Sequence, residues 1–249
     1  MAWVIDLDGV IWLGATPIPG SADAVSRLRA AGADVLFVTN NSFATLAEQE
    51  AKLASFGIEA AGDVVTSAIV AADMVAPGER VFVLGGRGIV EAVQARGAVV
   101  VDEPAADVVL VGLDRSLSYD RLDRAARAVR GGARFVATNT DSTYPTAQGL
   151  QPGGGAIVAA VATAAGAEPL VAGKPHAPAA EYIRHRLGAE GIMVGDRPGT
   201  DGHFAVVLGY RFGLVLSGVT TSSDLPVDPP PDVVAPDLSG LVSAVLGPA

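Results

Sequence analysis

Short runs of β-branched residues alternate with Ala-rich segments from one end of this chain to the other. Each run is long enough for one buried strand, and each segment that follows has the apolar spacing of a helix. This alternation is typical of a parallel sheet whose strands are connected by helices. The chain has 249 residues, half of them apolar, which is enough to bury a sizeable core. The sequence therefore predicts an α/β fold.

The alternation is interrupted at Pro77-Gly78, and a second series of strands and helices begins at Arg80. The pattern of the first series, in which short apolar runs alternate with helical segments, returns near the C-terminal third of the chain. We therefore predict two domains: a Rossmann-like parallel sheet core formed by residues 1–79 and 173–249, and an inserted α/β domain over residues 80–172.

Local signals predict several helix boundaries. Ser21 is expected to cap a helix that runs to Ala31, and Thr45 with Glu48 has the pattern of a capping box. A Gly-rich turn at 153–155 is expected to open an Ala-rich helix.

The composition excludes several classes of function. A formal net charge of −10 and a pI near 4.7 argue against a nucleic-acid partner, which would need clustered Lys and Arg. The chain has no cysteine, so disulfides, thiolate catalysis and Cys-ligated metal centres are excluded. The first residues lack the pattern of a signal peptide, and no apolar run reaches the roughly 18 residues of a membrane span. We therefore expect a cytoplasmic protein with no nucleic-acid or membrane partner.

Two carboxylates end the first predicted strand. Asp6 and Asp8 flank Leu7 and precede Gly9, and residues two apart on a strand point to the same side. Like charges that close are unfavourable without a cation. An Asx turn that leads into Gly9 explains the same residues, so this motif alone leaves both interpretations open.

Two further polar motifs follow predicted strands. Thr39, Asn40 and Asn41 provide hydroxyl, amide and backbone donors that suit a phosphate, although a helix-capping loop has the same composition. Lys174 follows a short apolar strand, where it would either neutralise nearby carboxylates or remain a solvated surface residue.

Asp196 and Asp201 lie in an acidic loop after another apolar run, and a tight Gly/Asp/Pro turn also explains this loop. Four polar motifs that each end a buried strand are nevertheless difficult to explain as unrelated turns. The carboxyl ends of parallel strands form the binding crevice of open α/β sheets, so we expect one functional site there. Oxygen ligands without His or Cys favour Mg²⁺ as its cation.

The order D-x-D-G, T-N-N-S, G-K-P and G-D-x(4)-D resembles the motifs of the haloacid dehalogenase superfamily of phosphohydrolases. The segment between Asp8 and Thr39 is too short for an inserted domain, whereas the one between Asn41 and Lys174 is long enough. This placement is similar to that of the NagD-like class IIA phosphatases, the group of p-nitrophenyl phosphatase, phosphoglycolate phosphatase and pyridoxal phosphate phosphatase. The resemblance covers the whole chain and implies that the inserted domain is a cap.

The resemblance implies Mg²⁺-dependent hydrolysis of small phosphate monoesters through an aspartyl-phosphate. It implies that Asp6 is the nucleophile, that Asp8 is the general acid and base, and that Lys174 balances the charge on Asp6 and the phosphate. The residues implied to bind phosphate are Thr39, Asn40, Asn41, Gly9 and Lys174. The implied metal ligands are Asp6, Asp196 and the carbonyl of Asp8, supported by Asp201.

Asn139 and Asp141, in the segment ATNTDSTYP, are expected to select the substrate from the cap. The sequence leaves open glycerol phosphate, phosphoglycolate, sugar phosphates, nucleotides and pyridoxal phosphate, and it leaves open a monomer or a homodimer. His203 departs from the apolar helix start that the resemblance implies, and we expect it to be an exposed substitution.

Two other classes of protein compete with this interpretation. The run from Val81 to Gly88 is a strand followed by a Gly-rich turn, as in dinucleotide-binding oxidoreductases, although Glu91 stands where that motif has its third glycine. A receiver-like phospho-acceptor domain also uses strand-end aspartates and Mg²⁺, but the large insertion argues against it.

Overall fold

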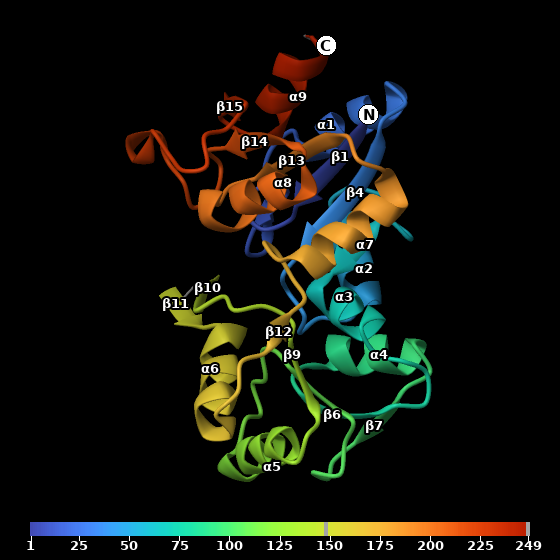
Figure 1. Cartoon of the computed structure of the whole chain (residues 1–249). Helices are drawn as coiled ribbons and strands as arrows, with labels where there is room; N and C mark the ends of the chain where they lie inside the picture. Colours follow the sequence, from blue (N-terminus) through green and yellow to red (C-terminus); the bar gives the residue numbers. More distant parts are fainter. Residues whose placement is uncertain (147–148, 248–249) are drawn as a thin grey trace. The chain divides into compact units, whose positions relative to one another are not determined.

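The computed structural model describes residues 1–146 and 149–247. Its chain divides into two compact units, each with its own main sheet (Figure 1). The two units are described separately below. Unit 1 consists of residues 1–39, 49–65 and 174–249, and unit 2 of residues 40–48 and 66–173.

Unit 1 contains a six-stranded sheet with the order β15-β14-β13-β1-β4-β5. Figure 1 shows blue strands from the N-terminal part of the chain beside orange strands from the C-terminal part, because β1 pairs in parallel with both β4 and β13. The strands are β1 (Ala2–Asp6), β4 (Asp34–Thr39), β5 (Val64–Thr66), β13 (Gly191–Gly195), β14 (Arg211–Val215) and β15 (Val233–Ala235).

All five residues of β1 are buried, so this strand lacks the alternation of buried and exposed residues that a strand with one solvent-exposed face shows. This is the pattern of a parallel strand covered by helices on both sides. The helices of unit 1 are α1 (Ser21–Ala30), most of α2 (Leu46–Ser55), α7 (Ala177–Leu187), α8 (His203–Leu208) and α9 (Leu238–Leu246). Its shorter elements are the hairpin of β2 (Trp12–Leu13) and β3 (Thr16–Pro17), the π-helical turn η1 (Pro198–Gly202) and the 3-10 turn η2 (Ser222–Asp224).

Unit 2 contains a five-stranded parallel sheet with the order β12-β9-β8-β6-β7. Its core packs Phe82 and Phe135 of the sheet against Val161 and other apolar residues of the helices. The elements of unit 2 are β6 (Arg80–Leu84), β7 (Val99–Val101), β8 (Val108–Val111), β9 (Arg134–Ala137), β12 (Leu170–Val171), the hairpin of β10 (Thr143–Thr146) and β11 (Gly149–Pro152), and the helices α3 (Ser67–Asp73), α4 (Arg87–Ala95), α5 (Tyr119–Arg130) and α6 (Gly154–Ala165).

The predicted α/β class is confirmed, because both main sheets are built from parallel strands connected by helices. The predicted domain boundary at Arg80 lies inside unit 2, because the longer segment of this unit begins at Thr66. Unit 2 also includes the segment Asn40–Glu48. Within the described parts of the chain, no helix is long and apolar enough to cross a membrane.

The local predictions have mixed outcomes. The capping box is confirmed: the Thr45 backbone N–H donates to Glu48 Oε2 at 2.9 Å, and the Glu48 N–H donates to Thr45 Oγ1 at 3.2 Å. The prediction that Ser21 caps α1 is wrong, because Gly20 occupies that position and the Ser21 hydroxyl donates to the Ile18 carbonyl at 2.8 Å. The Gly-rich turn does open α6.

Helix α9 begins with a side-chain cap that makes a direct test of local stability possible. Asp237 accepts a hydrogen bond from the Gly240 N–H at 2.8 Å, and α9 buries Leu238 and Leu241 behind this turn. Replacing Asp237 by Ala should lower the free energy of unfolding of unit 1 by about 1 kcal/mol, since an N–H at the helix start loses its acceptor. Asp237→Asn keeps a side-chain oxygen and should remain within about 0.5 kcal/mol of the wild type in urea denaturation. Equal losses in both variants would contradict the cap assignment.

Candidate active site

Three buried carboxylates meet at the carboxyl ends of the central strands of unit 1. Asp6 is the last residue of β1, Asp196 directly follows β13, and Asp201 lies in the turn η1. One carboxylate oxygen from each of them lies within 4.8 Å of the other two. Asp196 and Asp201 are each 1% exposed and Asp6 is 8% exposed. The parallel pairing of β1 with β13 brings these distant parts of the sequence together.

Lys174 is the cation of this cluster. Its ammonium group donates to Asp6 Oδ1 at 2.8 Å and to Asp201 Oδ1 at 2.7 Å, and its side chain is only 2% exposed. Asp201 also accepts a hydrogen bond on Oδ2 from the Arg197 N–H at 3.1 Å. Both oxygens of Asp201 therefore accept hydrogen bonds within unit 1.

The buried charges change the acidity of the cluster. Burial raises the pKa of Asp6 well above its usual range; Lys174 opposes this rise, whereas Asp201 and Asp196 add to it. Burial and the charge of Asp201 raise the pKa of Asp196 to about 6. Burial opposes the charge on Lys174, but Asp201 and Asp6 outweigh it and raise the pKa of this amine. One ammonium group therefore does not balance the carboxylates.

Asp196 has one oxygen that the protein leaves unsatisfied. Oδ2 accepts a hydrogen bond from the Val219 N–H at 2.6 Å, whereas Oδ1 is buried and has no hydrogen-bond partner within residues 1–146 and 149–247. A buried polar atom without a partner is costly unless a ligand satisfies it. Carboxylate oxygens suit Mg²⁺. The residues of the cluster thus fit the predicted cation, with Asp196 and Asp6 as the side chains that would hold it.

Gly9 and the loop after β14 shape the surroundings of Asp196. Gly9 has a φ of 86°, and a Cβ there would lie 2.4 Å from Asp196 Oδ2, so both the backbone conformation and the close approach require glycine. Ser217 donates to the Gly9 carbonyl at 2.7 Å. A Cβ at Gly218 would lie 2.0 Å from Asp196 Oδ2.

The sequence analysis missed Ser217, Gly218 and Val219. They come after Leu216, one residue beyond the apolar strand β14, where a Ser-Gly pair is the same kind of signal as the other strand-end motifs.

Asp8 lies outside the acidic cluster. Strand β1 ends at Asp6, so the alternation that was expected to point both carboxylates the same way no longer applies at Asp8. Asp8 is an exposed residue, and its Oδ1 accepts a hydrogen bond from the Trp12 indole N–H at 2.9 Å. The Lys52 ammonium lies 3.7 Å from the centre of the Trp12 ring. The two aspartates thus have different environments: Asp6 is buried in an ion pair and Asp8 is in contact with solvent.

The remaining predicted residues are divided between the units. Thr39 ends β4 in unit 1 and is 3% exposed, whereas Asn40 and Asn41 belong to unit 2. Asn41 is exposed, and its Oδ1 accepts hydrogen bonds from the backbone N–H groups of the turn that follows. Asn139 and Asp141 also belong to unit 2, where both contact Asn40.

His203 is the first residue of α8 and is exposed, as expected. Its ring Nδ1 lies 3.3 Å from the Pro198 carbonyl. The apolar face of α8 is kept by the residues that follow, with Phe204 and Leu208 buried.

The comparisons with known proteins agree with this geometry. A family model described as haloacid dehalogenase-like hydrolase matches residues 3–99, and one described as HAD-hydrolase-like matches residues 171–241. An acid sugar phosphatase from Staphylococcus saprophyticus is 37% identical over 231 residues, which cover 90% of this chain and 89% of that protein.

Solved structures give the same result. The p-nitrophenyl phosphatase from Archaeoglobus fulgidus is similar with a TM-score of 0.93 and 32% identity, over 98% of both chains. A glycerol phosphate phosphatase from Mycobacterium tuberculosis, crystallised with magnesium, is similar with a TM-score of 0.89 and 37% identity, over 96% of this chain and 75% of that one.

This chain belongs to the haloacid dehalogenase-like hydrolases. Within that family it is a phosphatase of the NagD-like class IIA group, so the resemblance inferred from the motifs is confirmed.

The glycine-rich turn after β6 has a packing role that explains its glycines without a dinucleotide. The Gly88 N–H donates to the Phe43 carbonyl at 3.0 Å. A Cβ at Gly88 would lie 2.1 Å from the Ala44 carbonyl oxygen, and one at Gly86 would lie 2.5 Å from the Phe43 ring. The chain itself therefore fills the space next to this turn.

The charge balance of the cluster predicts that Lys174 is essential for stability without a divalent cation. Lys174→Met should lower the free energy of unfolding by about 3 to 5 kcal/mol in the presence of a chelator, because it leaves buried carboxylates uncompensated. Mg²⁺ should recover part of this loss. Urea denaturation measures both effects, with Arg29→Met as the control, since Arg29 forms a partly exposed ion pair with Asp63. A stability of Lys174→Met equal to that of the control would contradict the charge balance.

Proposed function

We propose that this phosphatase hydrolyses small phosphate monoesters through an aspartyl-phosphate on Asp6, with Mg²⁺ as its cofactor. One observation carries the proposal: Asp6 ends the central strand β1 in a buried ion pair with Lys174, in the same cluster as Asp196, whose Oδ1 has no hydrogen-bond partner among the described residues. A nucleophilic carboxylate needs a fixed position, a charge partner and a site for the phosphoryl oxygens. The cluster in unit 1 provides the first two and fits a cation that would provide part of the third.

In the first step a carboxylate oxygen of Asp6 attacks phosphorus and the bond from phosphorus to the ester oxygen breaks. Asp8 donates a proton to the leaving alcohol. Lys174 donates a hydrogen bond to Oδ1 of Asp6, and its positive charge balances the negative charge that develops on the phosphoryl group. When bound, Mg²⁺ would lower the energy of the developing charge on the phosphoryl oxygens.

In the second step water attacks the phosphorus of the aspartyl-phosphate. Asp8, now a carboxylate, accepts the proton of this water, and the bond from phosphorus to Asp6 breaks with release of inorganic phosphate. The contact of Asp8 with solvent suits a group that exchanges protons twice in each cycle, whereas the ion pair with Lys174 opposes the effect of burial on the pKa of Asp6 and favours its charged form. Thr39 and Asn40 are the proposed ligands of the phosphoryl oxygens.

The substrate class rests on the named relatives. They act on sugar phosphates, glycerol phosphate and p-nitrophenyl phosphate by their names, and these compounds share only the phosphoryl group. We propose the same breadth for this chain, with unit 2 as the cap that limits access to the site. Its location in the cytoplasm and its state as a monomer or homodimer stay predictions.

The metal requirement can be tested by binding as well as by activity. Mg²⁺ should raise the melting temperature of the wild type by mass action, and chelation should reverse both this rise and the activity. Asp196→Asn should lose the Mg²⁺-dependent rise, because the amide is a weaker ligand for the cation than the carboxylate. Asp228→Asn, in an exposed Pro-rich segment, serves as the control and should keep the rise. Full activity of the wild type in excess chelator would exclude the proposed cofactor.

The roles of the two aspartates can be separated with an activated ester. Asp6→Asn should form no phosphoenzyme, because the amide is far too weak a nucleophile. Asp8→Asn keeps the nucleophile but should slow the hydrolysis of the intermediate by roughly 10² to 10⁴. Since p-nitrophenyl phosphate has a leaving group that needs little protonation, Asp8→Asn should show a burst of nitrophenol and accumulate phosphoenzyme.

Rapid quench followed by mass spectrometry should find the added phosphoryl group on the peptide that contains Asp6. A phosphoenzyme in Asp6→Asn, or a label on Asp8 in the wild type, would show that the two roles are reversed.

A further inference from the structure

The polypeptide passes between the two compact units four times, after Thr39, Glu48, Val65 and Gly173. Two of these passages lie directly at residues of the proposed site: Thr39 is the last residue before the first passage, and Lys174 is the first residue after the last one. Asn40 and Gly173 are the neighbours of Thr39 and Lys174 in the sequence, and both belong to unit 2. Contacts that fix these two neighbours therefore also restrain Thr39 and Lys174.

Asn40, the first residue of unit 2, forms hydrogen bonds with Asn139, Ser67 and Asp141 of that unit. Its carbonyl accepts from the Asn139 side-chain amide and from the Ser67 hydroxyl, both at 2.8 Å. Its own side-chain amide donates to Asp141, at 3.2 Å from Oδ2 and 3.4 Å from Oδ1. Ser67 comes just after another passage of the chain. The backbone carbonyl and the side-chain amide of Asn40 thus both form hydrogen bonds within unit 2.

Gly173, the last residue of unit 2, is held by the same loop. Its N–H donates to the Thr138 carbonyl at 2.8 Å. A Cβ at this position would lie 2.5 Å from both the Thr138 carbonyl oxygen and Asn40 Oδ1, so glycine is needed for the close approach. The loop from Thr138 to Asp141 at the end of β9 therefore binds both the residue after Thr39 and the residue before Lys174.

This loop is itself rigidly fixed. Thr138 is fully buried and Asn139 is 5% exposed. Asn139 Oδ1 accepts a hydrogen bond from the Asp141 N–H at 3.1 Å, so the residue that holds the Asn40 carbonyl also orients Asp141. The Thr138 hydroxyl lies 2.9 Å from the Ser42 hydroxyl. These contacts use all polar atoms of the Asn139 side chain for structure.

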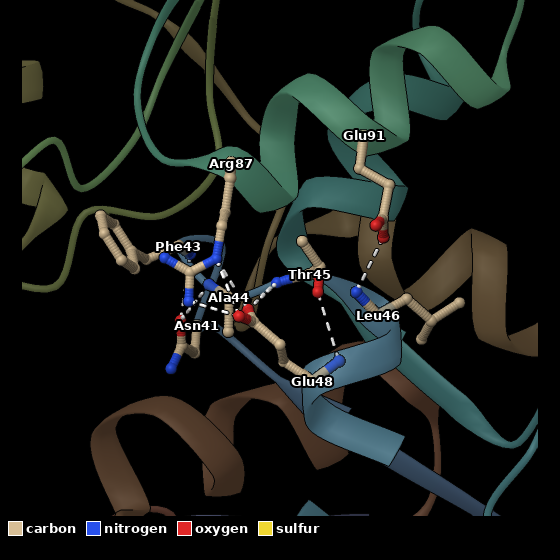
Figure 2. A network of polar contacts seen from close by, with 8 residues as sticks. All are labelled: Asn41, Phe43, Ala44, Thr45, Leu46, Glu48, Arg87 and Glu91. Atoms are coloured by element: carbon tan, nitrogen blue, oxygen red, sulfur yellow. Dashed lines mark hydrogen bonds and ion pairs between the residues drawn. The ribbon is translucent and has the colours of Figure 1, made fainter. Parts of the chain in front are cut away.

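A second set of contacts fixes the far end of the segment Asn40–Glu48, as Figure 2 shows. Arg87 of α4 forms an ion pair with Glu48 at 2.6 Å. Glu91, also of α4, accepts from the Leu46 N–H at 2.9 Å. The whole segment that follows Thr39 is therefore part of the body of unit 2.

We propose that Asn139 and Asp141 are positioning residues for phosphoryl binding, and that they act through Asn40 instead of selecting the leaving group as the sequence suggested. The proposal rests on the function proposed above. A residue that orients a ligand of the phosphoryl group affects every ester equally, because that group is common to all of them. A residue that contacts the leaving group affects esters unequally.

Asp141→Ala tests this role, because it removes an acceptor of the Asn40 side chain. We expect kcat/KM to fall by a common factor of about ten for p-nitrophenyl phosphate, glycerol phosphate and a hexose phosphate, the size of one lost hydrogen bond. The inhibition constant of inorganic phosphate should rise by a similar factor. Asp141→Asn keeps an oxygen that can accept from Asn40 and should recover most of the loss. Asp123→Ala breaks a partly exposed ion pair with Arg127 in the same unit and should match the wild type.

Unequal effects on the three esters, with an unchanged inhibition constant of inorganic phosphate, would overturn the proposal in favour of leaving-group selection. Asn139→Asp provides a second variant, since it replaces the donor to the Asn40 carbonyl by an acceptor and should reproduce the common loss.

Hydrogen exchange separates this proposal from the proposed function. The peptide that contains Asn40 should exchange faster in Asp141→Ala than in the wild type, whether or not any ester is hydrolysed, and unchanged exchange would overturn the anchor. A wild type that hydrolyses none of the three esters would instead contradict the proposed function.

Discussion

The ion pairs of Lys174 with Asp6 and Asp201 are the interaction on which the rest of the site depends. Burying carboxylates together is unfavourable, and the ammonium group offsets only part of their repulsion. The same arrangement fixes Asp6 at the end of β1, and the charge of Lys174 opposes the rise in the pKa of Asp6 that burial causes. The raised pKa of Asp196, and its Oδ1 without a hydrogen-bond partner among the described residues, are the features that would suit a second cation in this cluster.

Close approach of the backbone is the second constraint, and glycine is the residue that permits it. Gly9 and Gly218 lie against Asp196, where a side chain on either would overlap the carboxylate. Gly173 plays the corresponding part in unit 2, where it lies against Thr138 and Asn40. In each case a loop at a strand end is held by hydrogen bonds from another loop, so the polar residues are oriented by neighbours that are distant in sequence.

Much of the fold was predictable because hydrophobic periodicity reports burial directly. The strands around Asp6, Thr39 and Asp196 were identified as apolar runs, and the capping box of Thr45 and Glu48 was identified from two residues. The hairpin of β10 and β11 was not predicted, since its residues carry no strong alternation of apolar and polar side chains and all four residues of β11 are exposed. The cap of α1 was assigned one residue too late because Gly20 and Ser21 are both acceptable at that position.

The sequence by itself determined the class of the fold, the strand-end positions of the candidate residues and the chemistry that oxygen ligands without Cys permit. It did so because strand periodicity and residue type are local properties. The tertiary structure decided which of these residues meet: Asp201 with Lys174, Asp8 with Trp12, and Asn139 and Asp141 with Asn40. Those pairings depend on strand order and on the packing of loops from separate parts of the chain, which no local pattern encodes.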